Sequence, residues 1–282
     1  MSATESCPFD RYGPLAPLSP VVLSVPHAGR DYPLALRSAL RLPERALVAL
    51  EDRHVDAVAL AARDAQTTFV ARRARAWIDL NRAEHERDPR IDDGAAMAAG
   101  PVASAKVRAG LGLVPARVGG ADIWTRRLAA DEVAARIALD HRPYHAALAE
   151  ALRAARARFG IAVLLDIHSM PPIAARDPAR IVIGDRFGRS AAARFVSRIE
   201  AVARGAGLNV AANAPYAGGH ILQQQAQPGA AIHAVQLELD RSLYLDATLD
   251  APGAGFEATV TLLRAIIEAL TDEALPQALA AE

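Results

Sequence analysis

The 282-residue sequence has a single cysteine, Cys7, so no disulfide can form within the chain. Lysine is nearly absent, because Lys106 is the only one and arginine supplies the other positive charges. No net charge remains, since 32 basic residues balance 32 acidic ones, and this excludes a strong global attraction to nucleic acid or to a membrane surface. No apolar run approaches the roughly 18 residues of a membrane span, and no signal-peptide pattern is present. We therefore expect a cytoplasmic protein in a reducing compartment.

What is present is the composition of a globular chain, with 52% hydrophobic and 23% charged residues. Chains of this length often form one domain around a single sheet, so we expect one α/β domain over residues 1–282, with residues 1–18 as a tail. Residues 83–121 contain repeated Gly and Pro without a sustained period. Such a stretch predicts an active-site loop or a small excursion from the fold.

Short runs rich in Val, Ile and Leu alternate with longer Ala/Leu/Arg stretches of helical period, a pattern typical of α/β proteins. Most of the short runs are too apolar for a half-exposed strand, so helices should cover both faces of the sheet. We expect a three-layer α/β/α sandwich with a mostly parallel, mixed sheet. The predicted strands are 21–25, 67–70, 76–80, 162–167, 180–184, 208–211 and 233–239. The predicted helices are 44–65, 129–159, 190–205 and 255–270.

Polar side chains gather at or just after the ends of four predicted strands. In an open α/β sheet, ligands bind beyond the carboxyl ends of the strands, so these clusters should deliver reactive groups to one edge. The clusters are Pro26-His27-Ala28-Gly29, Asp79-Leu80-Asn81-Arg82, Asp166-Ile167-His168-Ser169 and Glu238-Leu239-Asp240-Arg241.

Two of these clusters contain a histidine directly after an apolar run. His27 and His168, with carboxylates nearby, suit a zinc site built from two His, one carboxylate and a water, although either histidine alone also fits a structural role. The third ligand stays open between Asp52, Asp56 and the neighbouring Glu51. In a helix Asp52 and Asp56 would share a face, but such a run also suits a solvated helix start.

Three further features suggest substrate binding or catalysis. Asn81-Arg82 combines an amide with a planar guanidinium and could hold a carboxylate, although surface arginines are abundant here. Glu238 lies within an apolar strand, where an unpaired carboxylate is costly, so it should face a cation, a water or the sheet edge. In the His141–His145 segment a proline breaks a helical stretch, and its polar groups could contact substrate or brace the fold.

Together these segments resemble the N-formylglutamate amidohydrolase family. The resemblance runs in order from about Val21 to Tyr244, and the ordered series is more specific than any one piece. The matching segments are VVLSVPHAGRDYP, EDRHVD, WIDLNR, GLGLVP, HRPYHAAL, LLDIHSMPP, PYAGGHI and VQLELDRSLYL.

The resemblance implies a phosphorylase/hydrolase-like fold related to zinc carboxypeptidases, one zinc or other divalent metal per chain, and a place in histidine degradation. It implies that His27 and His168 are metal ligands, that Asn81-Arg82 binds the substrate carboxylate, and that Glu238 is the general base. The zinc carboxypeptidases carry a glutamate ligand three residues after the first histidine, where this sequence has Arg30. Asp52 is therefore the expected third ligand, by similarity to the family's segment.

The implied reaction is hydrolysis of the formyl amide of N-formyl-L-glutamate or of a similar N-formyl or N-acyl amino acid. Arg142 is expected to meet the developing oxyanion. Arg30, Arg117 and Arg241 are candidates for a second substrate carboxylate. The alternatives are an N-acyl amino acid hydrolase or small-peptide carboxypeptidase of the same fold, and a non-catalytic carboxylate-binding protein. We expect no nucleic-acid or membrane partner, and the sequence leaves a homo-oligomer open.

Overall fold

The computed structural model describes residues 7–95 and 104–279. The chain divides into two compact units, each assembled from three stretches of sequence. Unit 1 comprises 1–10, 26–51 and 70–146, and unit 2 comprises 11–25, 52–69 and 147–282. The expectation of one domain stays a prediction.

Unit 2 is built on a mixed sheet of seven strands, and the chain passes between the units within the two strands β1 and β3. The pairs β2/β6, β6/β9 and β7/β8 are parallel, whereas β7/β9 is antiparallel. Every residue of the central strands β2, β6 and β9 is buried, as the continuous apolar runs predict. In sheet order the strands are β1 Phe9–Tyr12, β3 Thr68–Ala71, β2 Val21–Val25, β6 Ala162–Met170, β9 Ile232–Asp240, β7 Ile181–Gly184 and β8 Val210–Ala212.

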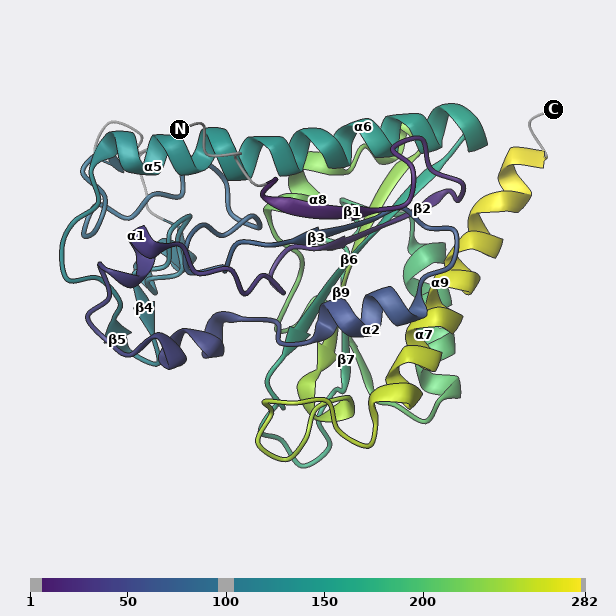
Figure 1. Cartoon of the computed structure of the whole chain (residues 1–282). Coiled ribbons are helices and arrows are strands. Elements are labelled where there is room, and N and C mark those ends of the chain that lie inside the picture. The colour runs from purple at the N-terminus through teal and green to yellow at the C-terminus, as the bar shows by residue number, and fades with distance from the viewer. Residues whose placement is uncertain (1–6, 96–103, 280–282) are drawn as a thin grey trace. The chain divides into compact units, whose positions relative to one another are not determined.

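Helices cover both faces of this sheet, and the α/β/α class is confirmed. The helices α2 (Val55–Ala62), α7 (Ala193–Gly205) and α9 (Phe256–Leu279) contact one another and the sheet on one face. Figure 1 shows α6 (Arg142–Phe159) and α8 (His220–Gln225) on the opposite side of the sheet. Among the described helices, none combines the length and apolar character that crossing a bilayer requires.

Unit 1 contains short elements between irregular segments. The stretch expected as a loop or excursion includes a small hairpin, in which Gly119 and Gly120 both have positive φ, as a two-residue turn of this kind demands. Whether this stretch acts as an active-site loop stays a prediction. The elements are α1 Leu34–Arg37, the 3₁₀ segment Glu44–Leu50, α4 Ala105–Arg108, β4 Arg117–Val118, β5 Ala121–Asp122, α5 Ala130–Arg136 and the π turn Ile137–His141. The short 3₁₀ segments Pro228–Ala230 and Arg241–Leu243 belong to unit 2.

The helix expected over residues 44–65 is interrupted, and this prediction is wrong. A 3₁₀ segment ends at Leu50, and α2 begins only at Val55, after His54 adopts a left-handed conformation with φ 58°. Asp52 therefore precedes α2, and it does not share a helical face with Asp56.

Three further local expectations are wrong. Residues 76–80 form no strand, because the chain turns at Trp77, and the Asp79 side chain accepts the Asn81 backbone N–H, which stabilises a turn. Residues 9–12 form strand β1, although they belong to the expected tail. Pro143 does not break its helix, because a π turn lies directly before α6 and accommodates a residue without an N–H.

Candidate active site

In unit 2, the central strands β6 and β9 bring His168 and Glu238 side by side. The two residues are register partners on adjacent parallel strands, so their side chains leave the sheet on the same face. Asp166 and Gln236, two residues earlier on each strand, share that face because side chains alternate along a strand. All four side chains are buried. The sheet register thus concentrates polar groups near the carboxyl ends of two strands.

His168 has a carboxylate at each ring nitrogen. Its Nδ1 lies 3.0 Å from Asp52 Oδ2, and its Nε2 lies 2.8 Å from Asp166 Oδ2. The other oxygen of Asp166, Oδ1, accepts a 2.7 Å hydrogen bond from the hydroxyl of Ser24, its register partner on β2. Both oxygens of Asp166 are therefore engaged, and the imidazole is held between two acids.

This arrangement concentrates negative charge. Burial acts to lower the pKa of His168, but Asp166, Asp52 and Glu238 outweigh it and raise that pKa well above its usual value. Three buried carboxylates around one imidazole require compensating positive charge, which a proton on His168, the nearby Arg241 guanidinium or a metal ion can supply. Asp52 Oδ2 and His168 Nδ1, at 3.0 Å, are close enough for both to bind one zinc at about 2.0–2.2 Å. The residues present therefore fit a divalent metal.

Arg241 extends the same cluster at the end of β9. Its Nε donates to Ser169 Oγ at 3.1 Å, and its Nη2 lies 3.4 Å from Asp52 Oδ1. The side chain is 11% exposed, and these contacts hold it in the cluster. Of the acids considered from the sequence, Asp52 contacts His168, whereas Asp56 lies half-buried in the first turn of α2. Glu51, the third candidate, belongs to unit 1 and accepts a hydrogen bond from Tyr32.

In unit 1, His27 follows β2 and is likewise held by a buried acid. Its Nε2 lies 2.7 Å from Asp79 Oδ1. Gly29 fixes the chain just after it, since a Cβ there would lie 2.1 Å from the Arg73 carbonyl oxygen, so only glycine allows this approach.

Asp79 is fully buried and surrounded by donors. Arg75 Nε donates to Oδ2 at 2.9 Å, the Asn81 N–H donates to Oδ1 at 2.8 Å, and Arg82 Nη2 lies 3.8 Å from Oδ2. Burial acts to raise the pKa of Asp79, but Arg75, Arg82 and His27 outweigh it and hold that pKa well below its usual value. Asp79 is therefore a stable anion that orients His27.

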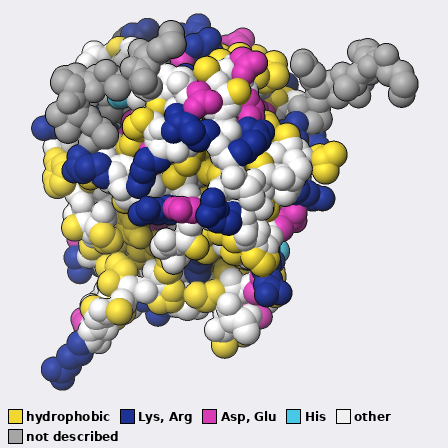
Figure 2. Space-filling model, turned by 90° about the vertical axis from the view of Figure 1, so that its left-hand side faces the viewer, with side chains coloured by type: hydrophobic (Ala, Val, Ile, Leu, Met, Phe, Trp, Pro, Cys, Tyr) yellow, Lys and Arg dark blue, Asp and Glu magenta, His cyan; other side chains and the backbone are white. Residues whose placement is uncertain are grey.

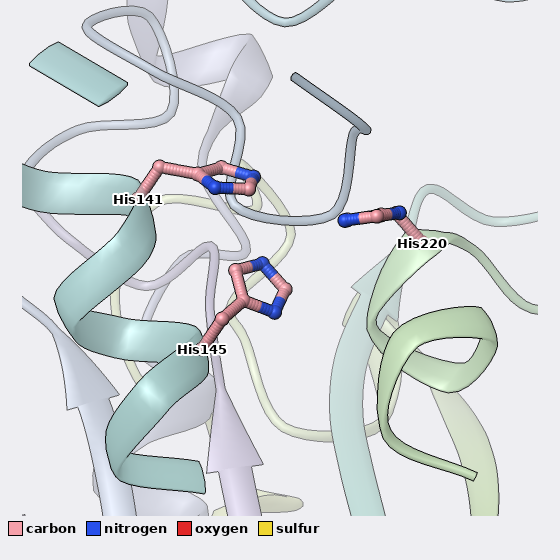
Figure 3. Close-up of side chains that lie close together, drawn as sticks. All are labelled: His141, His145 and His220. Carbon is pink, nitrogen blue, oxygen red and sulfur yellow. The ribbon is translucent and has the colours of Figure 1, made fainter. Parts of the chain in front are cut away.

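The segment expected to bind the substrate carboxylate is held firmly in unit 1. Arg82 is buried, with Nε donating to the Leu111 carbonyl at 2.8 Å and Nη1 to the Asn81 carbonyl at 2.7 Å. His141, the last residue of the π turn, and His145, in the first turn of α6, point the same way (Figure 3). Their Nε2 atoms lie 2.8 and 2.9 Å from the carbonyl oxygens of Arg82 and Leu80. Because a carbonyl accepts, both Nε2 atoms carry the proton, and burial lowers the pKa of His141. The two histidines thus brace the 80–82 turn.

His220 and Arg142 lie in different units and have different surroundings. His220, also drawn in Figure 3, begins α8 and belongs to unit 2. Arg142 is 63% exposed and forms an ion pair with Glu84 at 2.8 Å, so its contact with an oxyanion stays a prediction.

Several exposed arginines of unit 1 are paired with acids. Arg117 pairs with Asp122, and Arg127 pairs with Asp93. Figure 2 shows basic side chains lying among acidic ones on one face of the molecule. Charges of both signs on this face do not favour a polyanionic partner.

The sequence-based reasoning missed the roles of Asp79 and Asp166, although both lie in clusters that it singled out. An acid two residues before a histidine in an apolar strand, as in Leu165-Asp166-Ile167-His168, faces the same side as that histidine. This spacing was a usable signal for Asp166. For Asp79, in a turn far from His27 in sequence, no such signal existed.

Comparison with known proteins agrees with this chemistry. The family model for N-formylglutamate amidohydrolase matches residues 19–245. An N-formylglutamate deformylase of Pseudomonas aeruginosa is 30% identical over 89% of this chain and 92% of its own length, and one of Pseudomonas putida is 32% identical over 81% and 83%. A crystal structure of N-formylglutamate amidohydrolase from Ralstonia eutropha JMP134 has a TM-score of 0.85 and 31% identity, covering 95% of this chain and 98% of that one.

Fold, buried acid–base groups and relatives together define an amidohydrolase of the α/β/α class that acts on linear amides. The chain belongs to the N-formylglutamate amidohydrolase family, and the resemblance noted in the sequence is confirmed.

Proposed function

We propose that this enzyme hydrolyses the formyl amide of N-formyl-L-glutamate, or of a closely similar N-formyl or N-acyl amino acid, with zinc as cofactor. The family, and the deformylase activity by which its relatives are named, support the substrate class. The observation that carries the chemistry is the buried Asp52–His168–Asp166 arrangement beside Glu238, because a cation and a proton acceptor are the two groups that amide hydrolysis needs.

For the metal we propose His27, Asp52 and His168 as ligands. The Asp52–His168 contact in unit 2 supports two of them, and the family resemblance supports His27, which unit 1 holds through Asp79. When bound, a divalent metal supplies Lewis-acid polarisation of the scissile carbonyl and lowers the pKa of a nearby water.

Glu238 is the proposed general base. Its Oε1 accepts a 2.8 Å hydrogen bond from Gln236 Nε2, while Gln236 Oε1 accepts the Gly219 N–H at 3.1 Å. Because Gly219 fixes the amide oxygen, the Gln236 NH₂ group must face Glu238, where it orients the carboxylate. In the reaction Glu238 takes a proton from the attacking water, and the oxygen of that water adds to the formyl carbon. It returns that proton to the amine nitrogen as the C–N bond breaks, which gives formate and the free amino acid.

The carboxylates of the substrate require cations. Arg241 is the strongest candidate in unit 2, because its side chain is partly exposed and its guanidinium lies beside Asp52. Asn81, Arg82 and Arg142 remain proposed contacts in unit 1. Arg82 already donates to two carbonyl oxygens there, and the planar guanidinium has further N–H groups that can donate to a ligand.

A substrate panel tests this function. Purified protein is assayed by formate release and amine appearance on N-formyl-L-glutamate, N-formyl-L-aspartate, N-formylglycine, N-acetyl-L-glutamate and a dipeptide ending in glutamate. Each assay is run as isolated, after chelation and after zinc return. We expect the highest kcat/KM on N-formyl-L-glutamate, lost with chelation and restored by zinc. A preference for the acetyl compound or the dipeptide would assign the alternative hydrolase functions, and turnover of none would favour a non-catalytic binding protein.

A further inference from the structure

We infer that Asp166 and Asp79 are positioning residues for the metal site, that both make their histidines bind metal through Nδ1, and that Asp166 contributes more to metal affinity than Asp79. This inference rests on the proposed function. It assigns roles to two buried acids outside the proposed ligand set, each argued within its own unit.

The contacts of His168 decide which of its nitrogens is available to a metal. Its Nε2 donates to Asp166 Oδ2 at 2.8 Å, and Asp166 is in turn held by the Ser24 hydroxyl at 2.7 Å. Its Nδ1 is the nitrogen that faces the proposed ligand Asp52. A histidine ligand commonly donates its other N–H to a carboxylate, which fixes the tautomer and the ring orientation and increases ligand basicity. Asp166 therefore sets His168 to bind through Nδ1.

His27 likewise has a buried carboxylate at its Nε2, although this acid comes from a different part of the sequence. Its Nε2 lies 2.7 Å from the fully buried Asp79, so a metal bound by His27 is bound through Nδ1. One acid comes from the middle of strand β6, and the other comes from a turn after β3. That the two unrelated segments place an acid on the same ring nitrogen indicates a functional requirement.

The two acids differ in how much of their charge reaches the histidine. Asp79 also interacts with Arg75 at 2.9 Å and Arg82 at 3.8 Å, so two cations offset its charge. Within the described part of the chain, the side chain of Asp166 contacts the neutral Ser24 hydroxyl and His168 itself. An acid that is not offset by cations polarises its imidazole more strongly. This difference predicts that Asp166 has the larger effect.

The test measures zinc affinity by competition with a chromogenic chelator on full-length Asp166→Asn and Asp79→Asn proteins. We expect affinity about 10–100-fold weaker for Asp166→Asn, in line with second-sphere partners of metal ligands, and a smaller loss for Asp79→Asn. Matched controls are Asp240→Asn, a buried acid of unit 2 paired with Arg180, and Asp88→Asn, a buried acid of unit 1 paired with Arg90. The controls should alter melting temperature while zinc affinity stays within about twofold.

A milder variant and a spectroscopic readout keep the test decisive if an Asn variant does not fold. Ser24→Ala leaves Asp166 in place but removes its anchor, and should weaken zinc severalfold. Long-range ¹H–¹⁵N NMR of the zinc-loaded wild-type protein should show two histidines with a protonated Nε2 and a metal-bound Nδ1. Zinc affinity unchanged in Asp166→Asn, or coordination through Nε2, would overturn the inference and leave the proposed activity standing. A wild-type protein that binds no metal would remove the proposed cofactor as well.

Discussion

Replacing Glu238 by Gln separates the possible roles of this buried carboxylate. The amide has nearly the same volume and keeps an oxygen that can accept the Gln236 hydrogen bond, worth about 1 kcal/mol. What is lost is the charge beside His168 and the capacity to accept a proton. We expect the free energy of unfolding to change by about 1 kcal/mol, which moves Tm by about 2 °C in a chain of this size.

The effect on the rate should be much larger. A positioned general base contributes about 10²–10⁴-fold to kcat, or roughly 3–5 kcal/mol of the activation free energy. We expect Glu238→Gln to lose this factor with KM and zinc content nearly unchanged. Asp240→Asn is the matched control, because Asp240 lies on the same face of β9, is buried and pairs with Arg180 at 2.7 Å. It should lower Tm and retain an ordinary kcat per folded molecule.

Steady-state kinetics, zinc analysis and thermal melting on the two variants give distinct outcomes. Loss of zinc from Glu238→Gln would identify a metal ligand. A large drop in Tm with normal kcat would identify a structural residue. Full activity with full zinc content would refute the reasoning.

Further predictions concern metal, substrate and pH. His168→Ala should lose most bound zinc and nearly all activity while the fold survives, and retention of one zinc per chain in metal analysis would contradict this. Asp52→Ala should behave in the same way in that analysis, whereas Asp56→Ala, at a half-buried helix start, should be milder, and the reverse order would disprove our choice. Arg82→Lys should lower kcat/KM at least about a hundredfold and also lower Tm, because the planar guanidinium donates to two carbonyl oxygens. A lower Tm with unchanged kcat/KM would show that Arg82 has only a structural role. Burial lowers the pKa of His233 to about 4, so as the pH falls from about 6.5 towards 4 the unfolded chain binds a proton that the folded chain does not, and the free energy of unfolding should fall. His233→Asn should flatten this dependence of stability on pH in melting curves recorded with chelator. An unchanged slope would refute the assignment to His233.

Much of the fold could be predicted from local sequence. Strands β2, β6, β7 and β9 follow from apolar runs whose burial on both faces is a local property of composition. The long helical stretch before β6 follows from apolar spacing in the same way. Residues 76–80 were not predictable, because Ile78 and Leu80 are buried in a turn that Asp79 stabilises through its side chain, and apolar content alone does not distinguish this from a strand.

For the candidate site, the sequence by itself determined the residue types and their place near strand ends: His27, His168 and Glu238 stood out because polar groups in apolar surroundings are costly unless they have partners. Tertiary structure decided the pairings. The β6/β9 register placed His168 beside Glu238, and the break before α2 put Asp52, not a helical pair of acids, against the imidazole. Register and hydrogen-bond partners depend on residues far apart in the sequence, such as Asp52 and His168, which are 116 positions apart, and no local pattern encodes which of them meet.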